Sequence, residues 1–197
     1  MRRVALMAAL VAVGCYPAER SPGDSSRVDT DAERDAQRVS RDAFEKWNEA
    51  NKRLDAETSW RGMTRSLRQT WLWGRLRDNT DQDTQLHLKR LDAEERKILD
   101  KWYEAHEKWQ PQRAEMLPES ILNGRWLFNL YRQTMERARG DIQTQAEARR
   151  VLEVYVGLDG GVTILTDTLG VRELYDMMFE GDGWKVNLCK PAPHKKS

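Results

Sequence analysis

The spacing of apolar residues changes once along this chain, at about residue 150. Before that point apolar residues recur every three or four positions, which is typical of amphipathic helices. After it, short β-rich runs are separated by turns that contain Gly, which favours an antiparallel meander. Because the helices come first and the strands last, the sequence predicts an α+β domain, with long N-terminal helices packed on one face of a C-terminal four-stranded antiparallel β-meander.

The helical part opens with a capping box, Thr-x-x-Glu, at Thr30 to Glu33. An apolar stripe with helical spacing follows and predicts a helix of about seven turns. The members of this stripe are Ala32, Ala36, Val39, Ala43, Trp47, Ala50 and Leu54. Its alanine content favours close packing within one domain, although a coiled-coil seam has a similar spacing.

Three further helical segments are expected, over residues 60–77, 88–109 and 119–139. Asp92-x-x-Glu95 has the form of an N-terminal cap, so the second segment is also compatible with two shorter helices. Gly140 is expected to end the third segment as a C′ glycine. Thr144-x-x-Glu147 is another capping box and predicts a short helical lead-in to the first strand.

Four strands are expected, over residues 150–158, 161–168, 171–180 and 183–190. The first contains the run VLEVYV, which is apolar on both faces and therefore typical of a central strand. In the last strand Trp184, Val186 and Leu188 alternate with Lys185, Asn187 and Cys189, as expected of a half-buried strand.

Residues 146–189, and above all the run MMFEGDGWKVNL, resemble the ketosteroid-isomerase-like and SnoaL-like superfamily of cone-shaped α+β folds. The resemblance implies N-terminal helices against a curved sheet, with a pocket between them for a small apolar molecule. Members of that superfamily include enzymes and bare binding or scaffold domains. This chain departs from the pattern in its longer helical part and in the early strand, which is not visible here. No catalytic Tyr or Asp of the superfamily can be matched to it.

The chain begins with Arg2 and Arg3, followed by ten apolar residues, Val4 to Val13. As a helix these ten residues reach about 15 Å, roughly half of a bilayer core. The run is therefore too short for a transmembrane helix and predicts a cleaved secretory signal over residues 1–14.

The signal ends in Ala12-Val13-Gly14-Cys15, which resembles the lipobox of bacterial lipoproteins, with Ala12 where Leu is usual. The resemblance implies that Cys15 is the first mature residue and carries diacylglycerol and a further acyl chain. Two or three chains together anchor a protein stably, whereas one binds only marginally. Tyr16 follows where Asp would favour inner-membrane retention, so the resemblance implies an outer-membrane anchor facing the periplasm. The cell surface and the inner membrane are the alternatives.

The remaining chain divides by composition. Residues 15–28 contain the lipidated cysteine and a flexible tether rich in Pro, Ser and Gly. Residues 29–189 form a single α+β domain, helical over 29–150 and a sheet over 151–189. Residues 190–197 are basic and contain Pro, and are expected to be a disordered tail.

Charge and cysteine content exclude several classes of protein. Removal of residues 1–14 takes away two of the 33 basic residues, which leaves 31 against 32 acidic ones and a net charge of −1. This balance argues against a nucleic-acid partner. Lipidation of Cys15 leaves Cys189 as the only thiol, so no internal disulfide can form.

Five arginines between residues 59 and 77, where no acidic residue occurs, form the strongest candidate surface. They are Arg61, Arg65, Arg68, Arg75 and Arg77. The spacing of the first three places them on one helical face, opposite Met63, Leu67 and Trp71. Such a face can bind anionic lipid or phosphate-bearing envelope polymers. Alternatively, these arginines pair with the first helical region, where residues 28–58 carry nine acidic and six basic residues.

Other candidate chemistry is weaker. Eight tryptophans allow contact with peptidoglycan or polysaccharide, with Trp60 and Trp73 the expected exposed members, although packing explains most of them. His87, His106 and His194 form no metal-binding motif, so neither a metal nor a cofactor is expected. Candidate acids on the sheet are Glu153, Asp167, Glu173 and Asp176, of which Glu153 stands in the most apolar strand. Carboxylates at turn ends or edges that face water are the alternative.

The sequence therefore favours a lipid-anchored cell-envelope protein that acts as a non-catalytic binding or scaffold subunit of an envelope assembly. Its expected partners are the membrane, through the lipid, and other envelope proteins, with peptidoglycan or polysaccharide as a further candidate. The alternative is a domain of the isomerase-like cone class that binds a small apolar ligand or is weakly catalytic. No catalytic residue is assigned, and enzymatic activity is left open.

Overall fold

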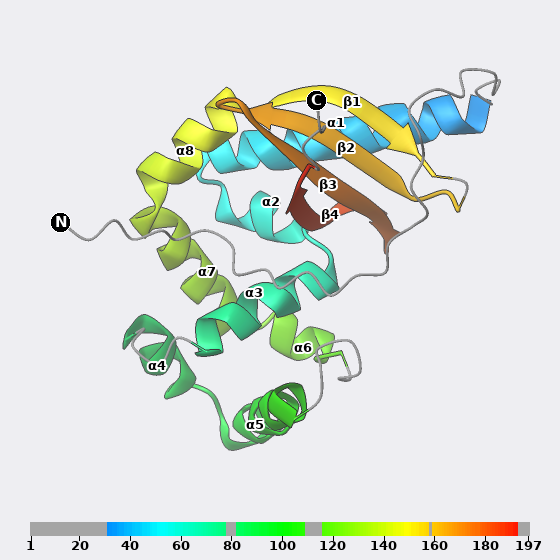
Figure 1. The fold of residues 1–197 in the computed structure, drawn as a ribbon. Coiled ribbons are helices and arrows are strands. Elements are labelled where there is room, and N and C mark those ends of the chain that lie inside the picture. The colour runs from blue at the N-terminus through cyan, green and yellow to red at the C-terminus, as the bar shows by residue number, and fades with distance from the viewer. Residues whose placement is uncertain (1–30, 78–81, 109–115, 158, 193–197) are drawn as a thin grey trace.

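A computed structural model describes residues 31–77, 82–108, 116–157 and 159–192 of the chain. It confirms the α+β class, with helices on one side of a C-terminal four-stranded antiparallel sheet (Figure 1). The helices are α1 (Asp31–Arg53), α2 (Ala56–Arg61), α3 (Arg65–Arg77), α4 (Gln82–Leu88), α5 (Ala93–Lys108), α6 (Glu119–Leu122), α7 (Arg125–Arg137) and α8 (Arg139–Ala148). The strands are β1 (Arg150–Val156), β2 (Val162–Thr168), β3 (Val171–Glu180) and β4 (Gly183–Pro191).

The sheet has the order β1-β2-β3-β4, so each strand pairs with its neighbour in sequence. The β2–β3 turn is the tight pair Leu169 and Gly170, with φ of 55° and 83°, as a two-residue hairpin turn requires. β4 continues through Pro191, and the Ala192 amide donates to the Arg172 carbonyl at 2.9 Å. The sheet therefore extends into the residues that were expected to begin the tail.

β1 is an edge strand, so the prediction of a central strand is wrong. Its inward residues Val154 and Val156 pack against the sheet core. The outward residues Leu152 and Tyr155 are apolar but about half exposed, at 45% and 47%. Apolar residues on both faces of β1 thus reflect an open outer face rather than burial between two layers.

α1 begins where the capping box predicted and packs inside the domain, against the sheet and α8. Most of the predicted apolar stripe faces the interior: Ala36, Ala43 and Trp47 pack against the sheet and Ala50 is buried. The buried face is wider than the stripe and does not include all of it. Val39 is 37% exposed, whereas Phe44 is 1% exposed and contacts the Tyr175 ring at 4.9 Å between centroids. The buried residues of α1 are Ser40, Phe44, Asn48, Ala50 and Asn51, most of which are polar.

The predicted helix over 60–77 is interrupted by an extended segment at residues 62–64. The Gly62 carbonyl accepts from the Val186 amide at 2.8 Å, and the Thr64 amide donates to the Val186 carbonyl at 2.9 Å. A Cβ on Gly62 would lie 2.8 Å from Trp47 Cδ1, so only glycine allows this close approach. The interruption joins the helical part to the free edge of β4.

The other predicted helices are also shorter than expected. Asp92 and Glu95 form a reciprocal capping box, with the Glu95 amide donating to Asp92 Oδ1 at 2.8 Å, so the helix expected over 88–109 begins only at Ala93, as α5, and α4 ends where that segment was expected to begin. The helix expected over 119–139 is divided into α6 and α7, and α8 follows it. Gly140 and Thr144 lie inside α8, so their assignments as a terminal glycine and a cap are wrong.

Two apolar clusters form the interior. The sheet cluster consists of Phe44, Val162, Ile164, Tyr175, Met177 and Val186. The helical cluster includes Leu72, Leu99, Ile121, Leu122, Leu127 and Leu130, each at most 2% exposed. Leu67 on α3 packs against both clusters and links them.

Tyr131 on α7 carries the main polar link within the helical cluster. The Ser59 hydroxyl donates to Asn51 Oδ1 at 2.9 Å and lies 2.7 Å from the Tyr131 hydroxyl. Tyr131 therefore donates to Ser59, and ionisation would remove that proton. Burial raises the pKa of Tyr131 to about 12 from an ordinary value of 10.0.

Stability is expected to fall as pH rises from about 10 to about 12, because the folded state holds the Tyr131 proton more tightly than the unfolded state does. The shift corresponds to about 2–3 kcal/mol at the alkaline end of that range. Urea unfolding across this range measures it. Tyr131→Phe should cost about 1 kcal/mol at neutral pH and make the alkaline decline shallower, leaving the contribution of other buried groups such as Cys189, whereas Tyr155→Phe, at an exposed position, should do neither. An equal decline in wild type and Tyr131→Phe would contradict the prediction.

Candidate functional site

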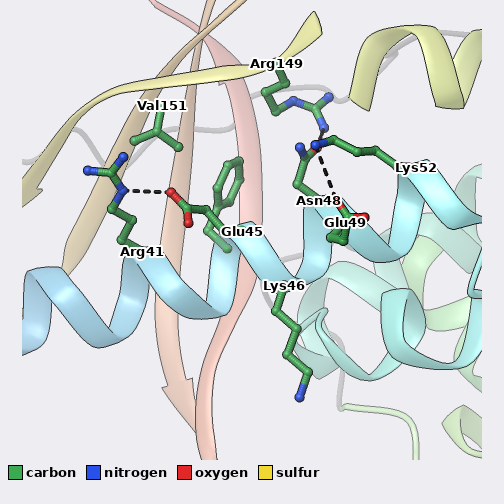
Figure 2. Close-up of a pocket in the computed structure, with 9 residues that line it drawn as sticks. Arg41, Glu45, Lys46, Asn48, Glu49, Lys52, Arg149 and Val151 are labelled. Carbon is green, nitrogen blue, oxygen red and sulfur yellow. Dashed lines mark hydrogen bonds and ion pairs between the residues drawn. The ribbon is translucent and has the colours of Figure 1, made fainter. Parts of the chain in front are cut away.

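An open groove of about 430 Å³ lies between α1 and the start of β1 (Figure 2). Residues of α1 form one wall, and the junction of α8 with β1 forms the other. The lining residues are Arg41, Phe44, Glu45, Lys46, Asn48, Glu49, Lys52, Arg149 and Val151. A second hollow, of about 410 Å³, is lined by Arg132, Gln133, Glu136 and Arg137 of α7. The first is the candidate site because it alone has a buried charged side chain in its wall.

That side chain is Arg149, which stands where α8 ends and the backbone becomes extended. Its side chain is only 7% exposed. The guanidinium lies over the Trp47 and Tyr175 rings, 5.6 and 5.2 Å from their centroids. Cation–π contacts of this kind stabilise a cation that is removed from water.

Asn48 fixes the orientation of the guanidinium. Arg149 Nη1 donates to Asn48 Oδ1 at 2.7 Å, and Asn48 Nδ2 donates to the Ala146 carbonyl at 3.0 Å. One buried amide on α1 therefore binds both the last turn of α8 and the arginine that follows it. The view in Figure 2 shows Arg149 directed toward Asn48, beside Lys52.

Glu173 supplies the opposite charge from β3. Its Oε2 lies 3.8 Å from Arg149 Nε and accepts from Tyr175 Oη at 3.0 Å and Thr168 Oγ1 at 3.1 Å. Burial raises the pKa of Tyr175 well above its usual range, and burial raises the pKa of the Cys189 thiol to about 11. Both groups are therefore protonated at neutral pH, and neither supplies a base or a thiolate nucleophile.

The exposed walls of the groove carry charges of both signs. Arg41 Nε donates to Glu45 Oε1 at 2.8 Å, and Lys52 Nζ lies 3.3 Å from Glu49 Oε2. Arg41, Lys52 and Arg149 point toward the groove, whereas Lys46 points away from it (Figure 2). Each of these three cations lies within 4.0 Å of a carboxylate, Glu45, Glu49 and Glu173 respectively. Arg41 and Lys52 are the ones that solvent reaches, so they can contact a polar segment that carries a negative charge.

The structure does not bring the five predicted arginines together. Arg61 lies on α2, before the interruption at 62–64, and pairs with Glu57 of the same helix at 2.7 Å. Arg68 is 5% exposed, and its Nη1 donates to Asn123 Oδ1 at 2.8 Å. A buried arginine cannot contact a lipid or polymer surface, so the predicted face loses its central member.

Arg65 also has a structural role. Its Nε lies 2.7 Å from Glu119 Oε1, and its Nη2 donates to the Leu117 carbonyl at 3.0 Å. The described partners of Arg61 and Arg65 thus lie on α2 and α6 rather than on α1, which differs from the expected pairing with the first helix. Arg77 is exposed and Arg75 is half-buried at the end of α3.

The fold also shows which of the other predicted residues are exposed and which are buried. Glu153 is exposed on the edge strand, so it is not the buried acid that its apolar strand suggested. Trp60 is 3% exposed and packs against Tyr131, whereas Trp73 is half-buried beside Trp102. Cys15 and His194 lie outside the described residues.

Among the described residues no group of three potential metal ligands comes together. None of the described helices is long and apolar enough to cross a membrane. His87 is 3% exposed, and its Nε2 lies 3.1 Å from Gln133 Oε1.

Sequence reasoning did not find Arg149 or Asn48. A signal was present, because Ser40, Phe44 and Asn48 recur at four-residue spacing and share one side of α1. Polar residues in line with a phenylalanine are typical of a buried polar contact, but the apolar stripe drew attention to the neighbouring side.

No family model, curated protein or solved structure matches the chain.

Loss of the Asn48 amide is expected to destabilise the fold, because it leaves the Ala146 carbonyl and one Arg149 nitrogen without their partner. Asn48→Ala should lower the free energy of unfolding by about 2–3 kcal/mol in urea denaturation. Lys46→Ala changes an exposed neighbour on the same helix and should stay within about 0.5 kcal/mol. Equal effects of the two changes would show that Asn48 does not organise the site.

Proposed function

We propose that this chain is a lipid-anchored cell-envelope protein whose domain acts as a non-catalytic binding or scaffold subunit of an envelope assembly. The anchor is the lipobox-type motif that ends in Cys15, with residues 16–28 as a tether. The groove between α1 and β1 is the proposed contact site. Its occupant is a polar, acidic segment of another envelope protein.

The observation that carries the binding role is the rigid, charged wall of this groove. Arg149 is held by Asn48, two aromatic rings and Glu173, so its position does not need to be ordered when a partner binds. Arg149 is itself buried and keeps this wall rigid rather than contacting the partner, and a rigid contact surface lowers the entropic cost of association. Arg41 and Lys52 lie nearer to solvent and supply steering charge for a negatively charged segment.

A catalytic role has less support from the same residues. The buried Tyr175 and Cys189 beside the groove are held protonated, and the two hollows described above are open and lined mostly by charged side chains. Neither of these two hollows is an apolar cavity with an inward acid, so neither favours the small-ligand alternative.

The anchor can be tested by labelling cells with an alkyne fatty acid. Wild type should incorporate the label, and intact mass should show a mature chain that starts at an acylated Cys15. Cys15→Ser should lose the label, whereas Cys189→Ser, which changes the other cysteine, should keep it. A retained initiator methionine or an unmodified thiol at position 15 would refute the proposed anchor.

The contact site can be tested by affinity capture of the full-length, tagged protein from gently solubilised envelopes. Arg41→Glu with Lys52→Glu should reduce recovery of a specific partner by about tenfold, since two attractive contacts become repulsive. Arg61→Glu with Arg77→Glu makes the same charge change on the arginine-rich segment and should leave recovery unchanged.

The converse result, with loss only in the Arg61 and Arg77 variant, would move the contact to the arginine-rich segment. Retention on purified peptidoglycan that needs neither pair would replace the protein partner with the cell wall. Capture that is equal for all variants would remove the groove from the function.

A further inference from the structure

The outer face of the sheet is not covered by any described helix (Figure 1). α1 and α8 pack on the inner face, which carries Ile164, Tyr175 and Val186. The outer face exposes large apolar side chains, with Tyr155 at 47% and Met178 at 49%. Leu188 shares the row of Tyr155, whereas Leu165 and Leu174 lie in the row beside it, and all three leucines are half-buried.

The strand register arranges the outward residues in rows across the sheet. The central row, read from β1 to β4, is Glu153, Leu165, Leu174 and Lys190. The next row is Tyr155, Thr163, Asp176 and Leu188. A third row, toward the other end, contains Arg150, Asp167 and Arg172 on the first three strands.

Each row is complementary to the same row of a second copy when that row is read from β4 to β1. A twofold axis that runs along the strands, between β2 and β3 of two stacked sheets, places β1 of one copy opposite β4 of the other. In the central row Glu153 then faces Lys190, and Leu165 faces Leu174. The arrangement gives an apolar centre with an ion pair on each side, because Glu153 of each copy lies opposite Lys190 of the other.

The other rows match in the same way. Tyr155 faces Leu188, so an aromatic–aliphatic contact replaces exposed surface. Thr163 faces Asp176 of the other copy, while its hydroxyl donates to Asp176 of its own copy at 3.0 Å. In the third row Asp167 faces Arg172. All three rows come from the observed register, so one symmetry operation places both Glu153 and Asp167 opposite basic residues.

We propose that the outer face of the sheet binds a second copy of this chain, with the two sheets stacked about a twofold axis nearly parallel to the strands. Stacked sheets are about 10 Å apart and cross at about 30°, so the axis bisects this angle and runs about 15° from the mean strand direction of each copy. This angle displaces the edge pairs by about one residue, which the long side chains of Glu153 and Lys190 can span. The pairing does not depend on the proposed function, because the groove lies on the inner side of β1.

The size of the face predicts a weak dimer. Four strands about 4.8 Å apart and seven residues of about 3.3 Å each give roughly 400 Å² per copy. Stable complexes bury about 800 Å² per partner, so the association is expected to depend on concentration and on salt.

Charge reversal tests the pairing in the full-length protein in detergent. Glu153 and Lys190 lie on opposite edge strands, about 14 Å apart in one copy, so they do not contact each other there. Glu153→Lys alone and Lys190→Glu alone should each weaken self-association by about tenfold or more in analytical ultracentrifugation. The double variant should regain wild-type association, because its ion pairs are restored in reverse.

A mixture of the two single variants gives the sharpest result. The Glu153→Lys copy is basic at both positions and the Lys190→Glu copy is acidic at both, so they should associate with each other although neither pairs with itself. Differently tagged copies and co-capture measure this directly. Effects within one copy, such as loss of the 3.1 Å contact of Lys190 Nζ with Asp176, cannot produce it.

Glu94→Lys and Arg96→Glu on α5 are the matched control reversals, and both should associate as wild type does. Circular dichroism and thermal unfolding check that each variant folds. A monomeric wild type at all accessible concentrations overturns the proposal, as does a mixture of folded single variants that fails to associate. Loss of a different captured protein from the face variants, with no change in self-association, also overturns it.

Discussion

The buried guanidinium of Arg149 is the constraint around which the two halves of the domain are arranged. The Arg149 side chain is only 7% exposed, and its charge needs partners because an unpaired buried ion is strongly destabilising. These partners come from α1, from β3 and from the aromatic rings between them, so the position of α1 on the sheet follows from what the guanidinium requires. Asn48 connects the two walls of the groove, because its amide bonds both the arginine and the end of α8.

A second junction, at residues 62–64, joins the helical part to the opposite edge of the sheet. Its two hydrogen bonds to Val186 give β4 a short parallel neighbour and satisfy backbone groups that an edge strand leaves unpaired. Next to it, β4 has one residue more than β3 between the pairs 176–188 and 177–186, and the side chain of the extra residue, Asn187, accepts from Thr64 Oγ1 at 2.8 Å. The β-bulge thus aims a polar side chain at the helical part, and the sheet is held on one edge by backbone pairing and on the inner face by packing.

The strands could be predicted to within a residue or two because their signals are local: alternation along each run and glycine at each turn. The helix boundaries could not, because the breaks depend on distant partners. Gly62 interrupts a helix because Trp47 and Val186 lie against it. These contacts are distant in sequence, and the pattern of residues 60–77 does not indicate them. The prediction of an arginine face is wrong for the same reason, because it required one continuous helix. Arg149 was missed because a charged residue at the end of a helix is usually solvent-exposed, and only the fold shows that this one is buried.

The first strand separates the two proposed contact surfaces. Val151 turns toward the groove with α1, whereas Glu153 and Tyr155 turn outward in line with β2. The register shift between Val151 and Glu153 absorbs Leu152 and restores the alternation, so one short edge strand contributes to both faces. Because strand side chains alternate, a contact on the outer face leaves the groove accessible, and a partner in the groove leaves the outer rows unchanged. A small domain with a filled interior can in this way hold two occupants at once, which is what a scaffold subunit requires.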